Sequence, residues 1–122
     1  RLKYKQMENS KKILIISHDP DFSEKVLESL KVTEADIILA KGLREGGDIL
    51  EKENIDRAII EYPVSCDSTV LSDLLSRPTL KQMPVLLAAK EKKFLDDFSG
   101  ENILKSSFDE INVGVQKLLE NF

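Results

Sequence analysis

The chain has 122 residues, the length of a single domain, and should bury roughly two-thirds of the surface that its unfolded form exposes. Its hydrophobic fraction of 41% and charged fraction of 33% are ordinary for a globular protein, and no apolar run reaches the roughly 20 residues that span a bilayer. A net charge of -4 argues against a nucleic-acid-binding surface, which is normally basic.

The first predicted element is a strand at 13–16, a continuous β-branched-rich run of the kind buried on both faces of a sheet. Pro20 suits the first turn of a helix whose apolar residues fall on one stripe. A second strand is predicted at 37–40 and a helix at 43–53, which two adjacent glycines weaken by up to about 1 kcal/mol each. A third strand follows at 58–60.

The second half of the chain continues the alternation of strand and helix. Leucines at helical spacing predict a helix near 70–75, and Pro78 is expected to stop it. A fourth strand is predicted at 85–88. A short helix is predicted at 92–98 because Phe94, Leu95 and Phe98 can share one side of it. Those three residues could also form part of an exposed surface, although helical spacing of this kind more often indicates core.

A brief fifth strand is predicted at 103–104, and the clearest helix begins at Ile111, with Asp109 placed to cap it or to favour its positive end. Five strands that alternate with five helices indicate an α/β fold with a parallel sheet covered on both faces. The natural candidate is the flavodoxin-like (βα)5 sandwich with strand order 2-1-3-4-5. In that order any site lies at the carboxyl ends of the strands, where Ser17–Asp19, Glu61 and Ala89 would surround one crevice.

The ends of the chain and its cysteine carry less information. Residues 1–10 are basic with scattered apolar residues, and we expect a linker or the end of an upstream segment, followed by one domain at 11–122. The stretch 1–12 lacks the apolar middle of a signal peptide. The single cysteine, Cys66, cannot form an internal disulfide, which fits a reducing, cytoplasmic setting.

Four blocks of the sequence carry a resemblance to a known family. "KKILIISHDPDF", "NIDRAIIEYP", "LKQMPVLLAA" and "ILKSSFDEI" resemble the first, third, fourth and fifth strand regions of response regulator receiver domains, and the spacings between the blocks agree. The resemblance covers nearly the whole chain. It implies a two-component signalling role, in which an aspartate takes a phosphoryl group from a histidine kinase with the help of Mg²⁺, a lysine and a hydroxyl group.

The acidic positions of that family are altered in this chain. The acidic pair after the first strand falls on Ser17 and His18, and only the following acid, Asp19, remains. The phosphoacceptor falls on Glu61, whose carboxylate lies about 1.5 Å further from the backbone than that of an aspartate, where a misplacement of about 1 Å can cost roughly 100-fold in rate. Glu61 is either a built-in anion that mimics a phosphorylated aspartate or a relic of lost catalysis, and we favour the relic.

The remaining positions of the family's site are altered too. The hydroxyl position falls on Ala89 and the switch aromatic of the fifth strand on Ile103. The lysine-proline step falls on Ser106 and Ser107, while Lys105 comes one residue early and is expected to face the other way. A slip of the strand by one residue would let Lys105 turn back toward the crevice, and the ungapped match argues against that slip.

Two other kinds of chemistry were weighed for the first crevice segment. Ser17, His18 and Asp19 are not a hydrolase triad, because triads are defined by convergence in space and neighbours at a strand end point in opposite directions. His18 and Asp19 could ligate a metal with Glu61, but a lone histidine in a crevice is more often a hydrogen-bonded loop residue. No cofactor is therefore expected, and Mg²⁺ enters only as an alternative.

These observations predict a degenerate receiver domain, or pseudo-receiver, that signals through protein contacts without aspartyl phosphorylation and is not an enzyme. Its partner is expected to be a protein or an adjoining domain, with a histidine kinase or a second copy among the candidates, and the face of the fourth and fifth helices as the contact. The alternatives are a phosphorylatable receiver with Mg²⁺ held by Asp19 and Glu61, and a flavodoxin-like domain that binds a small molecule.

Overall fold

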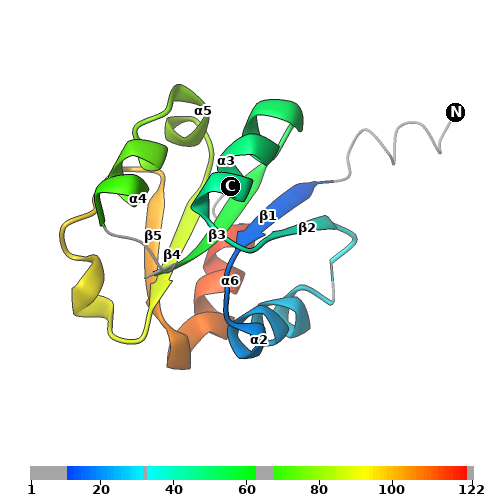
Figure 1. The fold of residues 1–122 in the computed structure, drawn as a ribbon. Coiled ribbons are helices and arrows are strands. Elements are labelled where there is room, and N and C mark those ends of the chain that lie inside the picture. Colours follow the sequence, from blue (N-terminus) through cyan, green and yellow to red (C-terminus); the bar gives the residue numbers. More distant parts are fainter. Residues whose placement is uncertain (1–10, 32, 63–67, 121–122) are drawn as a thin grey trace, which may run out of the picture.

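The structure is a computed structural model, and it describes residues 11–31, 33–62 and 68–120. In this part of the chain five parallel strands form one sheet in the order β2-β1-β3-β4-β5, which confirms the predicted flavodoxin-like order (Figure 1). The strands are β1 Lys12–Ile16, β2 Asp36–Ala40, β3 Arg57–Tyr62, β4 Val85–Ala89 and β5 Ile103–Ser107. The α-helices are α2 Pro20–Leu30, α3 Leu43–Lys52, α4 Ser68–Leu75, α5 Pro78–Lys81 and α6 Ile111–Glu120.

The passage from β1 into α2 shows how the sequence sets the local structure. Residues 13–16 are fully buried between two helical layers, as their continuous apolar run requires. Asp19 then adopts an extended conformation and caps α2, because its carboxylate accepts a hydrogen bond of 3.0 Å from the backbone N–H of Asp21. Pro20 occupies the first turn of the helix, where its missing N–H costs nothing.

Helices cover the two faces of the sheet unequally. We call the two sides of the sheet the α2/α6 face and the α3/α4 face. The core of the α2/α6 face consists of Ile13, Ile15, Phe22, Val26, Leu30, Ile59, Leu86, Ala88, Ile111, Val115 and Leu118. The core of the α3/α4 face also takes residues from α5 and from the segment after β4, including Leu14, Ile16, Leu43, Leu50, Ile60, Leu71, Leu74, Leu80, Leu87, Leu95 and Phe98.

The helix α3 forms despite its two glycines, and one of them has a packing role. A Cβ atom at Gly46 would lie 2.3 Å from Cδ1 of Ile16, so the missing side chain lets α3 lie close to the end of β1. The propensity penalty predicted from the sequence is therefore compensated by helix–sheet contact, which is the usual source of helix stability in proteins.

The connection between β4 and β5 differs from the prediction. Instead of a helix at 92–98, the chain forms the 3₁₀ turn η1, Lys92–Leu95, and then an irregular segment that includes Phe98. The side chains of Leu95 and Phe98 are nonetheless buried, whereas Phe94 is 44% exposed, so two of the three apolar residues belong to the core.

One short helix was missed, and two further details were predicted wrongly. Pro78 does stop α4, but it also begins the one-turn helix α5 that the sequence reading missed. Strand β5 is longer than predicted and runs to Ser107. Asp109 does not cap α6, since it lies inside the 3₁₀ turn η2, Phe108–Glu110, that precedes the helix at Ile111. Strand ends and turns of this kind are set by tertiary contacts that hydrophobic period does not report.

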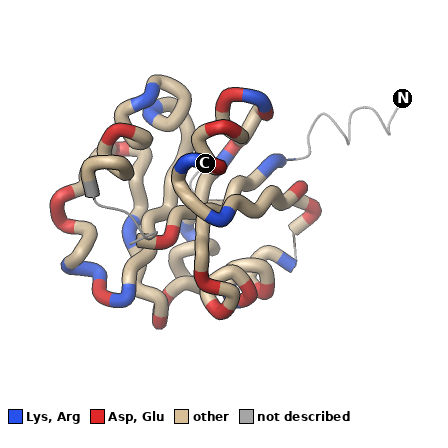
Figure 2. Tube along the Cα trace, in the orientation of Figure 1, with Lys and Arg blue, Asp and Glu red and all other residues tan. Residues whose placement is uncertain are grey.

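Charged side chains are spread over the described surface, with Lys and Arg interspersed among Asp and Glu (Figure 2). None of the helices in the part of the chain that the structure describes has the length and hydropathy of a membrane span.

Candidate functional site

Glu61 lies near the carboxyl end of β3, and its side chain is 4% exposed. It pairs in register with Ala88 of β4, so it points to the α2/α6 face of the sheet. Its Oε1 atom accepts a hydrogen bond of 2.7 Å from the hydroxyl group of Ser17 and one of 3.2 Å from the backbone N–H of His18. The carboxylate is thus buried and bound by groups of the chain itself.

Ser17 connects this carboxylate to the start of α2. Its hydroxyl oxygen accepts a hydrogen bond of 3.1 Å from the N–H of Asp19 and lies 3.1 Å from the carbonyl oxygen of the same residue. A hydroxyl has a single proton, and the shorter contact, 2.7 Å to Glu61, is the one in which a charged acceptor strengthens the bond. Ser17 is 7% exposed, so this small network is shielded from water.

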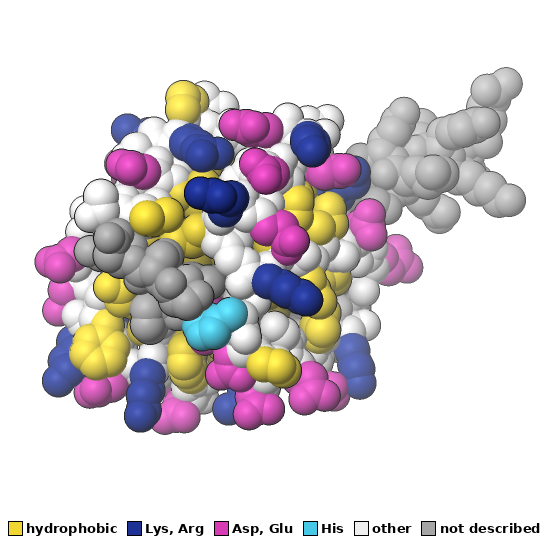
Figure 3. All heavy atoms as spheres, viewed as in Figure 1, with side chains coloured by type: hydrophobic (Ala, Val, Ile, Leu, Met, Phe, Trp, Pro, Cys, Tyr) yellow, Lys and Arg dark blue, Asp and Glu magenta, His cyan; other side chains and the backbone are white. Residues whose placement is uncertain are grey.

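His18 stands at the mouth of the crevice. Its Nδ1 atom is 3.6 Å from Oε1 of Glu61, and its side chain is 45% exposed (Figure 3, where the only histidine is cyan). The ring forms an ion pair with the carboxylate when it is protonated. The sequence predicted that His18 is a hydrogen-bonded loop residue. In the structure the hydrogen bond comes from its backbone N–H, which donates to Glu61.

Asp19 and Glu61 are the two acids that the sequence offered for a divalent metal. No group of three or more His, Cys, Asp or Glu side chains within residues 11–31, 33–62 and 68–120 is arranged to hold a metal ion. Asp19 uses one carboxylate oxygen to cap α2, and Glu61 turns one inward to Ser17. Mg²⁺ takes oxygen ligands in octahedral geometry and is usually held by one or two carboxylates plus waters, and here one oxygen of each of these two carboxylates is already engaged.

The structure separates the other predicted site positions from Glu61. Ser106 pairs with Ala88 and therefore shares the α2/α6 face with Glu61, at a distance of about two strand spacings, or roughly 10 Å. Its hydroxyl group donates to the carbonyl oxygen of Ser107 at 2.7 Å. Ala89 is fully buried in the core of the other face.

Lys105 and Ile103 also belong to that other face. Lys105 pairs with Leu87, whose side chain packs in the α3/α4 core, so the predicted opposite orientation of Lys105 and Ser106 agrees with the register. Ile103 packs against the same core from the beginning of β5. Neither side chain is directed at Glu61.

The contact between α6 and β5 closes the space beside Ser106. A Cβ atom at Gly114 would lie 3.0 Å from Cβ of Ser106 and 3.3 Å from Cδ1 of Leu86. The helix therefore sits directly over the position where the resemblance implies a lysine. The chain brings together Ser17, His18 and Glu61, and no Lys or Arg among the described residues forms an ion pair with Glu61.

Two features of the structure were not predicted. Arg57 is 5% exposed at the start of β3, and its Nε donates to the carbonyl oxygen of Leu118 at 3.2 Å, which supports the negative end of α6. A hollow lies beside α4, and its origin is the missing helix after β4. The basic charge of Arg57 directly before an apolar run was the available signal for the first feature. Cys66 lies outside the described residues.

Comparisons with known proteins give structural neighbours only. No family model matches the sequence, and no curated protein matches it. The chemotaxis protein CheY4 of Vibrio cholerae has a TM-score of 0.70 at 16% identity, over 92% of this chain and 98% of that one. The signal receiver domain of an HD domain-containing protein from Pseudomonas fluorescens Pf-5 has a TM-score of 0.69 at 14% identity, over 93% and 97%.

A de novo designed Rossmann 2x3 fold protein is similar to nearly the same degree, with a TM-score of 0.67 at 18% identity over 90% of each chain. A designed protein reaches this shape, so the shape does not by itself carry an activity. The natural neighbours described above are receiver domains. The chain has the fold of response regulator receiver domains.

Proposed function

We propose that this chain is a receiver-type signalling module that acts through protein contacts and does not accept a phosphoryl group on Glu61. One observation carries the proposal. Glu61 is 4% exposed, and its Oε1 atom already receives two hydrogen bonds, from Ser17 and His18. An attacking carboxylate must approach phosphorus in line, and the burial of Glu61 together with the two bonds to Oε1 works against that approach.

The surroundings of Glu61 support the same conclusion. A transferring phosphoryl group is stabilised by donors aimed at its oxygens, and the loss of one such donor typically costs about 100- to 1,000-fold in rate. The hydroxyl position is the buried methyl group of Ala89, the lysine position is Ser106, and Lys105 lies on the opposite face. Several losses of this size together would leave no useful transfer.

The structural neighbours support the part of the proposal that concerns signalling. The two natural neighbours are a chemotaxis protein and a signal receiver domain. Transferred to this chain, they suggest a role in signal transduction, with a protein or an adjoining domain as the partner. In this proposal the hydrogen bonds around Glu61 keep the crevice in one conformation, whereas a phosphorylatable receiver would have two.

The test is a titration of the ¹⁵N-labelled domain with Mg²⁺ and beryllofluoride, a phosphoryl mimic, followed by amide chemical shifts. We expect no saturable shift at His18, Glu61 or Ala89. The Glu61→Gln variant keeps the shape of the side chain without its charge and is the matched control. Saturation in the wild type that disappears in Glu61→Gln would establish a working acceptor and contradict the proposal.

A further inference from the structure

Strand β2 is one edge of the sheet, and its outer side is open. In the part of the chain that the structure describes, β2 pairs with β1 alone (Figure 1). After Asp36 the strand is entirely apolar, and Leu39, which lies beside Ile15 on the α2/α6 face, is 51% exposed. An edge strand with open backbone groups and apolar side chains is a template for pairing with another strand.

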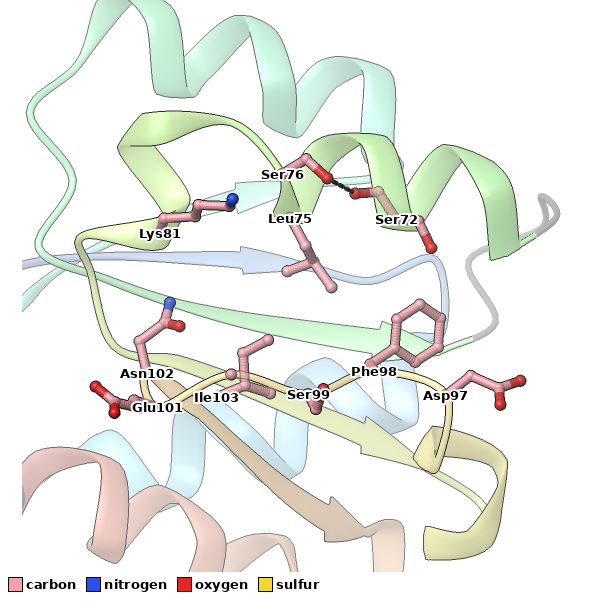
Figure 4. Close-up of a pocket in the computed structure, with 11 residues that line it drawn as sticks. Ser72, Leu75, Ser76, Lys81, Asp97, Phe98, Ser99, Glu101, Asn102 and Ile103 are labelled. Atoms are coloured by element: carbon pink, nitrogen blue, oxygen red, sulfur yellow. Dashed lines mark hydrogen bonds between the residues drawn. The ribbon is translucent and has the colours of Figure 1, made fainter.

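The opposite edge of the sheet, β5, is protected in the way that edge strands usually are. Its last three residues are Lys105, Ser106 and Ser107, and a lysine on an edge strand works against pairing. At its beginning Ile103 lines a hollow of about 800 Å³, across which Leu75 of α4 stands (Figure 4). The sheet therefore has one edge that discourages a further strand and one edge, β2, that does not.

The backbone groups that β2 offers follow from its pairing with β1. The N–H of Asp36 and the carbonyl oxygen of Ala40 both form hydrogen bonds on the β1 side, at 2.7 Å and 2.9 Å. Backbone groups alternate in direction along a parallel strand. The N–H and C=O groups of Ile37 and Leu39 therefore point to the free edge.

Beyond these two residues, the next outward N–H groups are already engaged. The N–H of Lys41 donates to Oε1 of Glu45 at 2.8 Å, and the N–H of Ala35 donates to Oγ1 of Thr33 at 3.4 Å. This pattern selects one register for a second β2 strand. An antiparallel pair uses all the open groups when residue 37 of one copy lies opposite residue 39 of the other, with residue 38 opposite itself on a twofold axis.

The apolar side chains of β2 complement a second copy in this register. Leu39 of one copy lies opposite Ile37 of the other, on the α2/α6 face, and the same contact occurs twice by symmetry. Ile38 meets its own copy on the α3/α4 face. Leu39 is exposed and the two isoleucines are only half-buried in the single chain, so pairing removes apolar surface from water.

Glu34 and Lys41 make the two ends of the strand complementary in charge. Both side chains are exposed, and Figure 2 shows acidic residues where β2 begins and a basic residue where it ends. In the register above, residue 41 of one copy lies opposite residue 35 of the other, and therefore next to Glu34. An acid thus meets a base at both ends of the paired strands.

The other charges near β2 offset one another within the chain. Lys12 of β1 lies beside Asp36 in the register, and Lys31 pairs with an acid of α2 at 3.0 Å. Arg44 and Glu45 are neighbours of opposite sign in the first turn of α3. The charges left for a partner are those of Glu34 and Lys41.

We propose that the domain forms a twofold dimer in which β2 pairs antiparallel with β2 of a second copy, so that the two five-stranded sheets join into one. Hydrogen bonds, apolar contacts and charges are all self-complementary in a single register, which favours a second copy over a strand of another protein. The inference rests on the proposed function in that the domain acts through protein contacts. It places the contact at β2, away from the face of the fourth and fifth helices that the sequence predicted.

Sedimentation equilibrium of the whole chain over a wide range of concentrations tests the dimer. We expect a monomer–dimer equilibrium. Leu39→Lys puts a charge into the paired strands twice by symmetry and should weaken association roughly tenfold or more. Val113→Lys, at a similarly exposed apolar position on α6, is the matched control and should associate like the wild type. Both should keep the wild-type melting temperature, because neither side chain is in the core.

Two charge variants test the register. Lys41→Glu and Glu34→Lys should each weaken the dimer several-fold, because like charges then meet at both ends of the paired strands. An equimolar mixture of the two variants should associate like the wild type, since every such contact again joins an acid and a base.

Three results would overturn the proposal: a monomer at every concentration, equal weakening by Leu39→Lys and Val113→Lys, or no recovery in the mixture of charge variants. A monomer whose Leu39 amide is nonetheless protected from hydrogen exchange would identify another segment as the occupant of the edge, and would also overturn it. None of these results bears on Glu61, so a failure here is distinct from a failure of the proposed function.

Discussion

The two faces of the sheet differ in how completely they are closed. On the α2/α6 face, two long helices pack on each other and on the strands, and even the polar pair Ser17 and Glu61 is satisfied internally. On the α3/α4 face, the irregular segment after η1 stands where a helix would complete the layer, and a hollow remains. The face on which receiver chemistry would depend is closed, and the open surface lies on the other one.

The largest expected contrast between the faces is one of stability. Leu86→Ala removes a fully buried side chain from the α2/α6 face and should lower the free energy of unfolding by about 2–5 kcal/mol. Leu75→Ala removes the same atoms from a half-buried wall of the hollow and should cost about 1 kcal/mol. Urea unfolding of both variants measures this, and equal losses would show that the hollow is closed in solution.

The second-largest effect on stability is expected from the hydrogen bonds around Glu61. Ser17→Ala removes the hydroxyl donor of a buried carboxylate and should destabilise the domain by about 1–3 kcal/mol. Ser99→Ala, at an exposed position beside the hollow, should change stability by no more than about 0.5 kcal/mol. Midpoints of urea unfolding at neutral pH compare the two serines. A neutral Ser17→Ala would mean that water replaces the hydroxyl and that the crevice is open.

The smallest effect concerns a charge at the beginning of β1. The hydrogen bond that Lys12 donates to Glu53, at 2.8 Å, together with the attraction of that carboxylate, raises the pKa of Lys12 above its ordinary value of 10.5. The contribution to stability is complete below pH 10.5 and is lost as the pH rises through the higher folded value. Wild type should therefore lose slightly more stability than Lys12→Met between about pH 9 and about pH 12. Parallel curves for the two proteins would contradict this coupling.

The sequence predicted the sheet well because its signals are local. Runs such as Ile13–Ile16 are long and β-branched, and the alternation of strands with helices leaves few possible topologies. It predicted the connection after β4 poorly. Phe94, Leu95 and Phe98 suggest a helix by spacing alone, but burial of Leu95 and Phe98 is also compatible with a 3₁₀ turn and an irregular segment.

The sequence predicted part of the cluster around Glu61, but not its geometry. The resemblance placed Ser17 and Glu61 at neighbouring strand ends, and the structure brings them together. That Ser17 binds the carboxylate depends on burial and side-chain direction, which one sequence does not report. The hollow was missed for the same reason as the 3₁₀ turn η1. Leu75 and Ile103 line it from positions far apart in the sequence, and the space between them is left because no α-helix follows β4.

The account depends most on the claim that Glu61 is a satisfied structural carboxylate. Intact-mass measurement after incubation with Mg²⁺ and acetyl phosphate, a small phosphodonor, tests that claim most directly. We predict that the mass of the wild-type domain stays unchanged. The addition of one phosphoryl group, present in the wild type and absent in Glu61→Gln, would contradict it.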